Sequence, residues 1–530
     1  MVKSTNPYIE VPTFENGQWD LTTFYTREEF RDFMLSCFKE PGKYQFDETS
    51  QIFNSEARKY QQNGYYCPAP VKTKDYINYW DDQKMKCKSG IIVKNNGNVW
   101  YISRDYYMWL NFLPIYDKEE KRFDFAKVRD AQYHMALYEL LAELHYKHSA
   151  ILKKRQIASS YFHAAKLINM YWFENGAVLK MGASLKDYIS EKGTWRMLAE
   201  YRTFLNEHTA WYRPSDPDKV FSWQQRIKVR IGGRDTFKGN KSIITGTSFE
   251  KDPTNGVGGP CTYFFHEEAG IAPKMDQTYE YMRPAMQSGM ITTGMFIAAG
   301  SVGDLDACEP LKLMVLQPEA NDIYPVDSNL IDKEGTLAKT GLFIPEQWSM
   351  PPFIDQYGNS KVEEALEAII EERLKWKRDL TPEQYQLRIS QKPTNIEEAF
   401  ATRKESKFPP HLVSKQIQRI QDKEYPVEYL DLSRNAEGKI IDKPSRKIPI
   451  MEFPISKKTE DKEGVICVYE RPIKDPSFGM YYASVDPVGE GKTTTSESLC
   501  AIYVYKNPVE IIKDEGNGKV ANSIERDKIV

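Results

Sequence analysis

The sequence predicts an α/β protein, with a mostly parallel sheet and helices on its faces. Short apolar segments alternate with amphipathic helices from about residue 126 to about residue 300, an order typical of parallel sheets. One apolar segment, residues 262–270 (Thr-Tyr-Phe-Phe-His-Glu-Glu-Ala-Gly), ends abruptly in the adjacent carboxylates Glu267 and Glu268. A functional site is therefore expected where this strand ends.

Composition limits the classes of function. The 530 residues are 41% hydrophobic and 28% charged, which is ordinary for a globular protein with two or three domains. A net charge of −3 means that a nucleic-acid partner would have to be met by local basic patches. The seven cysteines include no CxxC pair, which argues against a structural zinc site. No apolar run approaches about 20 residues and no secretory signal is apparent, so we expect a soluble intracellular protein with no membrane association.

The elements follow from local patterns. Residues 90–102 read as a β-hairpin around Asn96-Gly97, because both positions of a tight turn favour positive φ. Apolar residues at three- and four-residue intervals predict a helix over 131–144. A short strand over 150–152 and a helix over about 160–174 come next.

Further strands are expected after these elements. They cover 241–246, 263–265 and 295–299, and a charged helix is expected over 362–377. Residues 401–470 show weak periodicity and read as a linker or a subdomain of loops and short helices. Strand patterns return at 480–485 and 499–505.

Residues 153–160 (Lys-Lys-Arg-Gln-Ile-Ala-Ser-Ser) lie between a strand and a helix, the context of a phosphate-binding P-loop. In such a loop, backbone N–H groups surround the phosphates, a lysine reaches the β/γ oxygens and a hydroxyl binds Mg²⁺. Ser160 can supply that hydroxyl at the helix N-terminus, where the dipole favours anions. However, Ser159 replaces the usual lysine and Ala158 the usual glycine. Alone, the loop also reads as a basic helix start with serine caps.

The acidic pair strengthens the P-loop interpretation. Glu267 would hold Mg²⁺ through water, and Glu268 would orient or deprotonate an attacking water. The alternative is a solvated acidic pair at a helix start. The next strand, 295–299, ends in the small-residue loop Gly300-Ser-Val-Gly, where nucleotide-sensing elements lie in such folds.

The order of these motifs resembles the large terminase subunit of tailed bacteriophages and looks closest to the large terminases of crAss-like phages. This resemblance covers about residues 100–505. It implies a RecA/ASCE-like P-loop ATPase domain followed by an RNase H-like nuclease domain. The motifs that carry it are Tyr106-Tyr-Met-Trp-Leu-Asn-Phe-Leu-Pro-Ile115, the helix with Gln132, the loop 153–160, the strand 264–270, Ala299-Gly-Ser-Val-Gly303, Ile396-Glu-Glu-Ala-Phe400 and Ser484-Val-Asp-Pro487.

The resemblance also implies roles. Lys153 matches a Walker A lysine that is placed at the start of the loop, and Arg155 matches an arginine that other members of the family use in place of this lysine. Gln132 and Gln156 match positions that are associated with adenine recognition. Ser160 matches the Mg²⁺ hydroxyl. The expected nucleotide-binding residues are Gln132, Lys153, Lys154, Arg155, Gln156, Ile157, Ala158, Ser159 and Ser160.

Three further roles come from the strand ends. Glu267 matches the metal-site acid, Glu268 the catalytic carboxylate, and Gly300 and Ser301 the loop that couples hydrolysis to movement. The family more often has Asp at the position of Glu267. Together with Ala158 and Ser159, this departure puts the rate of ATP hydrolysis in question.

The resemblance divides the chain into four regions. These are 1–125 leading into the ATPase, the ATPase domain 126–400, a linker or subdomain 401–474, and the start of the nuclease 475–530. Asp486 matches the first acid of a nuclease site that uses Mg²⁺ or Mn²⁺. The other metal-binding acids should come from later strands, so we expect that this polypeptide alone does not cut DNA.

Local basic residues could contact DNA. In 223–241, Arg226, Lys228 and Arg230 alternate with aliphatic residues, and Arg234 follows after two glycines. Alternation puts the first three on one face of a strand. They could contact DNA phosphates, reach a neighbouring subunit's nucleotide, or simply face solvent.

The resemblance implies a motor that uses ATP and Mg²⁺ to move double-stranded DNA into procapsids. Its partners would be the portal protein of the procapsid, the small terminase subunit and further copies in a ring. It would work in the host cytoplasm, transiently at the portal. Two alternatives remain: a helicase-like P-loop ATPase, and a non-hydrolysing assembly or scaffold protein that keeps the ATPase fold.

Overall fold

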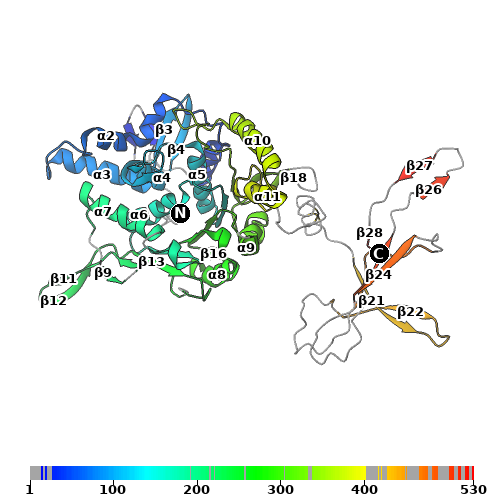
Figure 1. Cartoon of the computed structure of the whole chain (residues 1–530). Coiled ribbons are helices and arrows are strands. Elements are labelled where there is room, and N and C mark those ends of the chain that lie inside the picture. Colours follow the sequence, from blue (N-terminus) through cyan, green and yellow to red (C-terminus); the bar gives the residue numbers. More distant parts are fainter. Residues whose placement is uncertain are drawn as a thin grey trace. The chain divides into compact units, whose positions relative to one another are not determined.

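The structure is a computed structural model. In it the chain forms two compact units, Met1–Ser414 and Lys415–Val530 (Figure 1). Each unit is described by itself. The described residues are 13–15, 18–20 and 27–400 with short gaps at 191–192, 214–215, 220, 256–257, 304 and 332–336, and in 401–530 mainly the strands given below.

An eight-stranded sheet forms the centre of the first unit, in the order β20-β7-β17-β14-β8-β13-β10-β9. The strands from β20 to β13 are parallel, and β10 and β9 continue the sheet in antiparallel pairing. The predicted mostly parallel sheet is therefore confirmed. Its strands are β7 (Ser149–Lys153), β8 (Val178–Ala183), β9 (Asp216–Lys219), β10 (Ser222–Gln224), β13 (Ile243–Ser248), β14 (Tyr263–Glu267), β17 (Met295–Gly300) and β20 (Leu342–Ile344).

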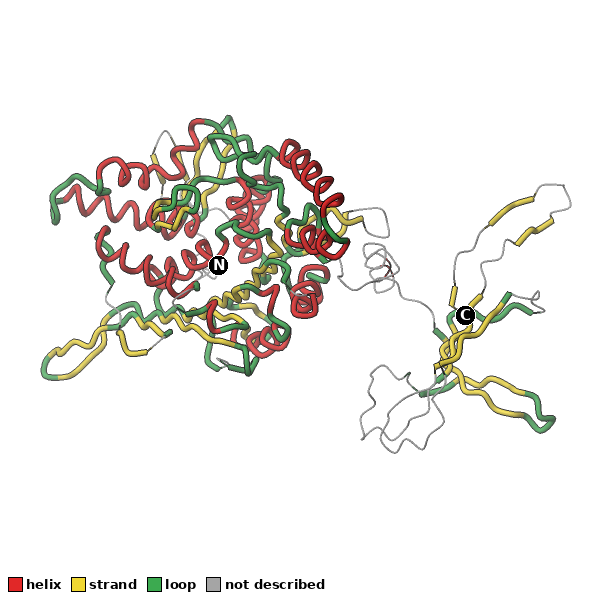
Figure 2. Tube along the Cα trace, in the orientation of Figure 1, coloured by secondary structure: helices red, strands yellow, loops and turns green. Residues whose placement is uncertain are grey.

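Helices cover both faces of this sheet (Figure 2). Side chains alternate along each strand, so Ile151 joins one buried cluster while Ala150 and Leu152 join the other. The helices α5 (Asp130–Leu144), α6 (Ser159–Phe173) and α7 (Thr194–His208) pack in the first cluster, and α8 (Met275–Met282) and α9 (Leu305–Leu316) pack in the second. The three-layer arrangement follows from strands that are apolar on both sides.

The N-terminal region shares the first of these cores. The predicted hairpin is confirmed, with Asn96 and Gly97 at φ of 46° and 71°. The segment 106–115 forms most of a helix whose side chains are nearly all buried, so this motif is mainly a packing element. The region contains β1 (Thr13–Glu15), β2 (Gln18–Asp20), α1 (Arg27–Cys37), η2 (Glu48–Asn54), α2 (Ser55–Asn63), α3 (Lys74–Ser89), β3 (Ile91–Asn95), β4 (Asn98–Ile102), α4 (Arg104–Phe112), β5 (Pro114–Asp117) and β6 (Arg122–Phe125).

Smaller elements complete the first unit. The predicted charged helix is α10 (Val362–Asp379). The remaining elements are η3 (Lys186–Tyr188), β11 (Ile227–Ile231), β12 (Arg234–Lys238), η4 (Ala269–Ile271), η5 (Arg283–Met286), β15 (Gln287–Ser288), β16 (Ile291–Thr292), η6 (Glu319–Asn321), β18 (Val326–Ile331), β19 (Leu337–Thr340), α11 (Pro382–Gln391) and α12 (Ile396–Ala399). No helix in the described part of the chain is both long and apolar enough to cross a bilayer.

The second unit holds strands that the sequence predicted only in part. Within 401–470, where we expected loops and short helices, lies a three-stranded antiparallel sheet. The two strands predicted near 480 and 500 pair in antiparallel fashion, with Asp486 opposite Ala501 at the end of β24. The strands are β21 (Glu428–Arg434), β22 (Ile440–Pro444), β23 (Ile466–Val468), β24 (Tyr481–Asp486), β25 (Ala501–Lys506), β26 (Ile511–Asp514), β27 (Val520–Ser523) and β28 (Lys528–Ile529).

Candidate functional site

The sheet has a topological switch point between β7 and β17. These strands are neighbours, yet β7 leads into α6 on one face and β17 leads into α9 on the other. In open parallel sheets, ligands bind at the carboxyl ends of the strands where connections diverge in this way. β14 lies directly beyond β17. The loops after β7, β14 and β17 therefore meet at one edge of the sheet.

The side chains at this edge are in direct contact. The Ser160 hydroxyl donates a hydrogen bond to Glu267 Oε1 at 2.8 Å. The Lys153 ammonium lies 3.4 Å from Glu268 Oε1. Both contacts join residues more than 100 positions apart. The structure therefore brings the basic loop and the acidic pair together, as the sequence hypothesis requires.

Glu267 is the most constrained acid of this site. Its side chain is only 3% exposed, and Thr194 Oγ1 donates a second hydrogen bond to its Oε2 at 2.6 Å. Burial and the neighbouring Glu268 raise the pKa of Glu267, while Lys153 and the two hydroxyls oppose the rise. The sequence reasoning missed Thr194. Its only signal was a hydroxyl residue in the first turn of a helix, which many proteins have.

Glu268 sits in a strained turn beside the loop after β17. Its backbone is left-handed, with φ of 45° and ψ of 50°, which is uncommon for a residue other than glycine. Ser301 Oγ lies 3.5 Å from Glu268 Oε2. A Cβ added to Gly270 would fall 1.8 Å from the Ser301 carbonyl oxygen, and one added to Gly300 would fall 2.3 Å from the Gly270 nitrogen. Only glycine allows these two loops to approach so closely.

The loop after β7 has the backbone of an anion cradle. Gln156 and Ala158 both have positive φ, 65° and 59°. Left-handed residues within such a loop turn successive N–H groups toward a common centre. Helix α6 begins directly after this loop at Ser159, and the first N–H groups of a helix have no partner within the helix. Ala158 thus adopts the conformation that glycine would adopt without strain.

Two residues of the loop are turned away from this centre. The Lys154 ammonium donates hydrogen bonds to the carbonyls of Glu346 and Ser349, and its N–H donates to Ile344. Burial lowers the pKa of Lys154 to about 8. These contacts fix the loop to the segment after β20, and a contact of Lys154 with a nucleotide stays a prediction.

Ser159 is turned into its own helix. Its hydroxyl lies 3.1 Å from His163 Nδ1, and His163 Nε2 lies 2.7 Å from Glu139. The three side chains are buried. Ser159 can therefore offer a ligand its backbone N–H, but its side chain does not replace the missing lysine.

The remaining loop residues are placed as follows. Arg155 and Gln156 are exposed, and Ile157 is buried. Gln132 Nε2 donates to the Ile157 carbonyl at 3.1 Å, while the buried Gln132 Oε1 has no partner among the described residues. An amide with one free acceptor beside the loop can bind a further donor.

The oxygen atoms at the site fit Mg²⁺. No group of three or more His, Cys, Asp or Glu side chains suited to a metal occurs among the described residues. Mg²⁺ does not need one, because it keeps several waters and is usually held by one or two protein oxygens plus substrate phosphates. Ser160 Oγ and the Glu267 carboxylate supply such oxygens.

The expected DNA-contacting cations lie on the β11–β12 hairpin, outside the central sheet (Figure 1). Lys228 and Arg230 lie on one face of β11, as predicted, and Arg226 lies directly before the strand. Arg234 pairs with Ile231, and therefore its side chain lies on the opposite face. The four cations do not form a single surface.

Three of these cations have partners within the hairpin. The Arg230 Nε–H donates a hydrogen bond to the Gly233 carbonyl at 3.4 Å. Lys228 pairs with Asp235 at 2.7 Å, and the Arg226 guanidinium lies 4.6 Å from the centre of the Phe237 ring. Both strands are largely exposed on both faces.

Asp486 is the last residue of β24, and the structure gives no account of its side chain.

Comparisons with known proteins give weak likenesses only. No protein-family profile matches the chain, and no curated protein matches it. Among solved structures, the large terminase ATPase domain of Thermus phage P74-26 has a TM-score of 0.30 and 8% sequence identity, and the match covers 46% of this chain and 87% of that one. A mutant of the same domain has a TM-score of 0.30 and 10% identity, and the match covers 45% of this chain and 85% of that one. The large terminase of bacteriophage HK97 has a TM-score of 0.28 with 12% identity, covering 46% and 48%. At these values the likenesses assign no residue a role.

Proposed function

We propose that the chain is the ATP-hydrolysing subunit of a viral DNA-packaging motor, a large terminase. One observation carries the ATPase part of this proposal. The loop after β7 and the acidic pair after β14 meet at the switch point of a parallel sheet, with Ser160 on Glu267 and Lys153 on Glu268.

In the proposed reaction, the N–H groups of residues 155–160 bind the β- and γ-phosphates of ATP. The Lys153 ammonium leaves Glu268 for the phosphate oxygens, where it offsets negative charge. Glu268 then accepts a hydrogen bond from the attacking water and orients it toward the γ-phosphorus. The strained backbone of Glu268 holds its carboxylate at the end of the strand.

A magnesium ion would be held by Ser160 Oγ and, through water, by Glu267. When bound, it would neutralise charge on the phosphate oxygens. Thr194 fixes the second oxygen of Glu267, so the carboxylate keeps one orientation. Gln132 would receive the adenine amino group at its free Oε1, with its Nε2 anchored on Ile157.

A phosphate-release assay tests this proposal. We expect Glu268→Gln to reduce ATP turnover by at least about 100-fold, because the water loses the group that orients it. Lys153→Ala should reduce turnover and nucleotide affinity together. Glu280→Gln, an exposed acid on α8, is the matched control and should leave turnover unchanged. Unaltered turnover in Glu268→Gln would refute the assigned site.

A second candidate is a non-hydrolysing assembly protein. Ala158 in a glycine conformation and Ser159 turned to His163 support it, because both depart from an efficient phosphate loop. Wild-type protein that binds Mg²⁺·ATP but shows no turnover with DNA and portal would favour this candidate. For the helicase-like alternative we find no support, since the described residues contain a single parallel sheet.

The motor's other properties are proposals that rest on the sequence resemblance. Gly300 and Ser301, adjacent to Glu268, would pass the state of the nucleotide to the rest of the chain. Arg226, Lys228 and Arg230 would contact phosphates of double-stranded DNA.

Asp486 would bind Mg²⁺ or Mn²⁺ in an RNase H-like nuclease. The portal protein, the small terminase subunit and a ring of copies at the procapsid in the host cytoplasm complete the proposed setting.

A further inference from the structure

One face of the β11–β12 hairpin is apolar in the middle and positive at the edge. The antiparallel register of β11 and β12 places Ile227, Val229 and Ile231 on the same face as Arg234 and Lys238. Ile227 is 40% exposed and Ile231 is 53% exposed. Neither Arg234 nor Lys238 forms an ion pair within the described chain. We call this surface the hairpin face.

A hairpin of two strands has little stability of its own in water. The hairpin face nevertheless leaves Ile227 and Ile231 about half exposed. Exposed aliphatic residues that are grouped and bordered by charge are typical of a protein-binding surface.

A second surface of the unit has the opposite charge. Ile370 and Leu374, one turn apart on α10, are 55% and 64% exposed. Glu363, Glu367 and Glu371 lie on or beside the same side of the helix, and none of them pairs with a cation of the described residues. We call this surface the α10 face.

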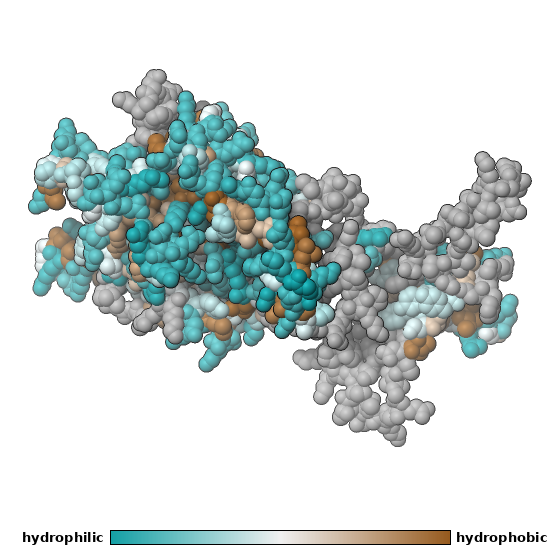
Figure 3. All heavy atoms as spheres, turned by 45° about the horizontal axis from the view of Figure 1, so that its top comes forward, coloured by the Kyte–Doolittle hydropathy of each residue, from teal (hydrophilic) through white to brown (hydrophobic). Residues whose placement is uncertain are grey.

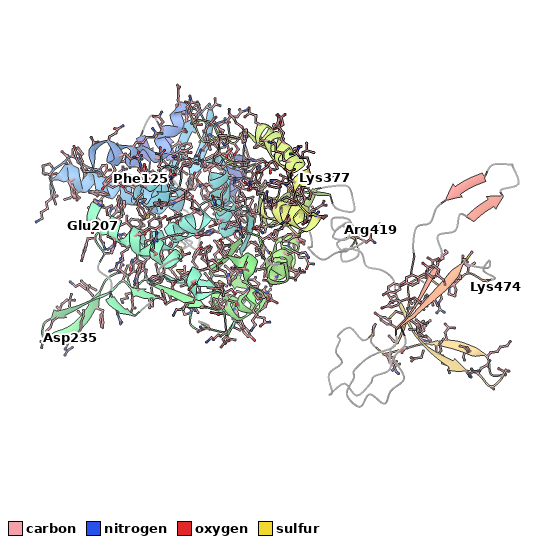
Figure 4. All side chains as sticks on the ribbon, viewed as in Figure 1. Phe125, Glu207, Asp235, Lys377, Arg419 and Lys474 are labelled. Atoms are coloured by element: carbon pink, nitrogen blue, oxygen red, sulfur yellow. The ribbon has the colours of Figure 1, made fainter. Side chains whose placement is uncertain are left out.

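The two faces lie at opposite ends of the first unit. Figure 4 labels Asp235 in the hairpin and Lys377 in the last turn of α10, and the body of the unit separates them. Figure 3 shows the surface of this unit as mainly hydrophilic, with separate apolar areas. One copy of the chain cannot bring its own two faces together.

We propose that the hairpin face of one copy docks on the α10 face of a second copy. Arg234 and Lys238 would meet the three unpaired carboxylates, and the aliphatic residues of the two faces would pack between them. The lengths agree: β11 extends about 13 Å from Ile227 to Ile231, and α10 extends about 16 Å from Glu363 to Leu374.

Such a contact joins two different surfaces, so it is heterologous and leaves a free face at each end of a dimer. It would close into a ring or continue as a filament, depending on the rotation between copies. One helix on one hairpin is a small interface, so the association should be weak at low protein concentration and sensitive to salt. This inference does not depend on ATP hydrolysis.

Charge reversal in the full-length protein tests it, with sedimentation velocity at low ionic strength as the measurement. Reversing the hairpin face by Arg234→Glu with Lys238→Glu should weaken self-association by at least about 10-fold, because like charges then face each other. Reversing the α10 face by Glu367→Lys with Glu371→Lys should have the same effect. A mixture of the two variants should associate again, which also shows that both fold.

The control reverses charge on the other face of the same hairpin. Lys228→Glu with Arg230→Glu changes the net charge equally and should leave self-association intact. The proposal is overturned if the wild type stays monomeric at the highest soluble concentration, or if the mixture fails to associate. It is also overturned if reversal of the hairpin face weakens binding to duplex DNA and leaves self-association unchanged.

Discussion

At the residue scale, the site combines strain with desolvation. Ala158 and Glu268 both adopt left-handed backbone conformations, and Glu267 is buried beside a second carboxylate. Each feature costs folding free energy, and all lie where the phosphate and metal ligands would bind. Strained and desolvated groups are retained mainly at sites where function depends on them.

Replacing Ala158 by glycine should relieve part of this strain. A left-handed alanine destabilises the folded state by about 1–2 kcal/mol. Glycine removes this strain, but its larger conformational entropy in the unfolded state offsets about 0.5–1 kcal/mol of the gain. We expect Ala158→Gly to raise the free energy of unfolding slightly and not to slow ATP turnover. Ala199→Gly, within α7, is the control and should lower stability by about 1 kcal/mol. A clear loss of stability in Ala158→Gly would contradict the left-handed conformation.

The buried Glu267 predicts a pH-dependent stability. Its folded pKa is raised above the usual 4.5, so the folded state holds the proton more tightly than the unfolded state. The stability gained from this is complete below the unfolded pKa and is lost as the pH rises through the folded pKa. Glu267→Gln cannot ionise, and therefore it should melt at a higher temperature than wild type at pH 7.5 in EDTA.

This advantage of Glu267→Gln should shrink as the pH falls toward 4.5, because the wild-type carboxyl then becomes neutral as well. Glu280→Gln, at an exposed position outside the site, is the control. A constant difference in melting temperature across this pH range would show that Glu267 does not titrate with a raised pKa.

At the element scale, the sequence patterns predicted single strands and helices better than they predicted which strands are adjacent in the sheet. Strands β7, β13, β14 and β17 and helices α5, α6 and α10 have strong periodicity, and all were predicted. The central strand β8 was missed, because Lys180 and Gly182 interrupt its apolar pattern. The order β7-β17-β14 could not be derived, since strand order depends on packing between distant segments.

The same limit applies to the site. Residues next to each other in the chain, such as Glu267 and Glu268, could be assigned together from one motif. Thr194 reaches Glu267 from a separate helix, and only tertiary structure reveals the contact. The side-chain directions of Lys154 and Ser159 were also beyond the sequence, because both positions lie in a pattern that a phosphate loop would share.

The loops after β14 and β17 should act as one element. In Gly270→Ala, the new Cβ would lie 1.8 Å from the Ser301 carbonyl oxygen, so the two loops must separate. We expect a loss of stability of about 2 kcal/mol or more, together with a loss of turnover, since Glu268 would move. Gly176→Ala is the control: its φ is also positive, at 70°, but its surroundings are open. It should cost only about 1–2 kcal/mol of backbone strain and preserve turnover.

At the scale of the whole molecule, the proposed nucleotide site and the proposed self-association faces lie on separate surfaces of the first unit. The proposed nucleotide site lies at the carboxyl edge of the sheet, and the hairpin and α10 faces lie at opposite ends of the unit. Self-association and hydrolysis can therefore be changed independently by mutation. The proposed motor would need both, because a ring of subunits would have to hold DNA while each site turns over.

An experimental structure of Glu268→Gln with Mg²⁺ and ATP tests the proposed nucleotide site most directly. We expect the phosphates in the loop 153–160, the Lys153 ammonium within hydrogen-bonding distance of a phosphate oxygen, and Mg²⁺ on Ser160 Oγ. A nucleotide bound elsewhere on the chain would contradict it. So would saturating Mg²⁺·ATP that leaves the contacts of Ser160 with Glu267 and of Lys153 with residue 268 unchanged.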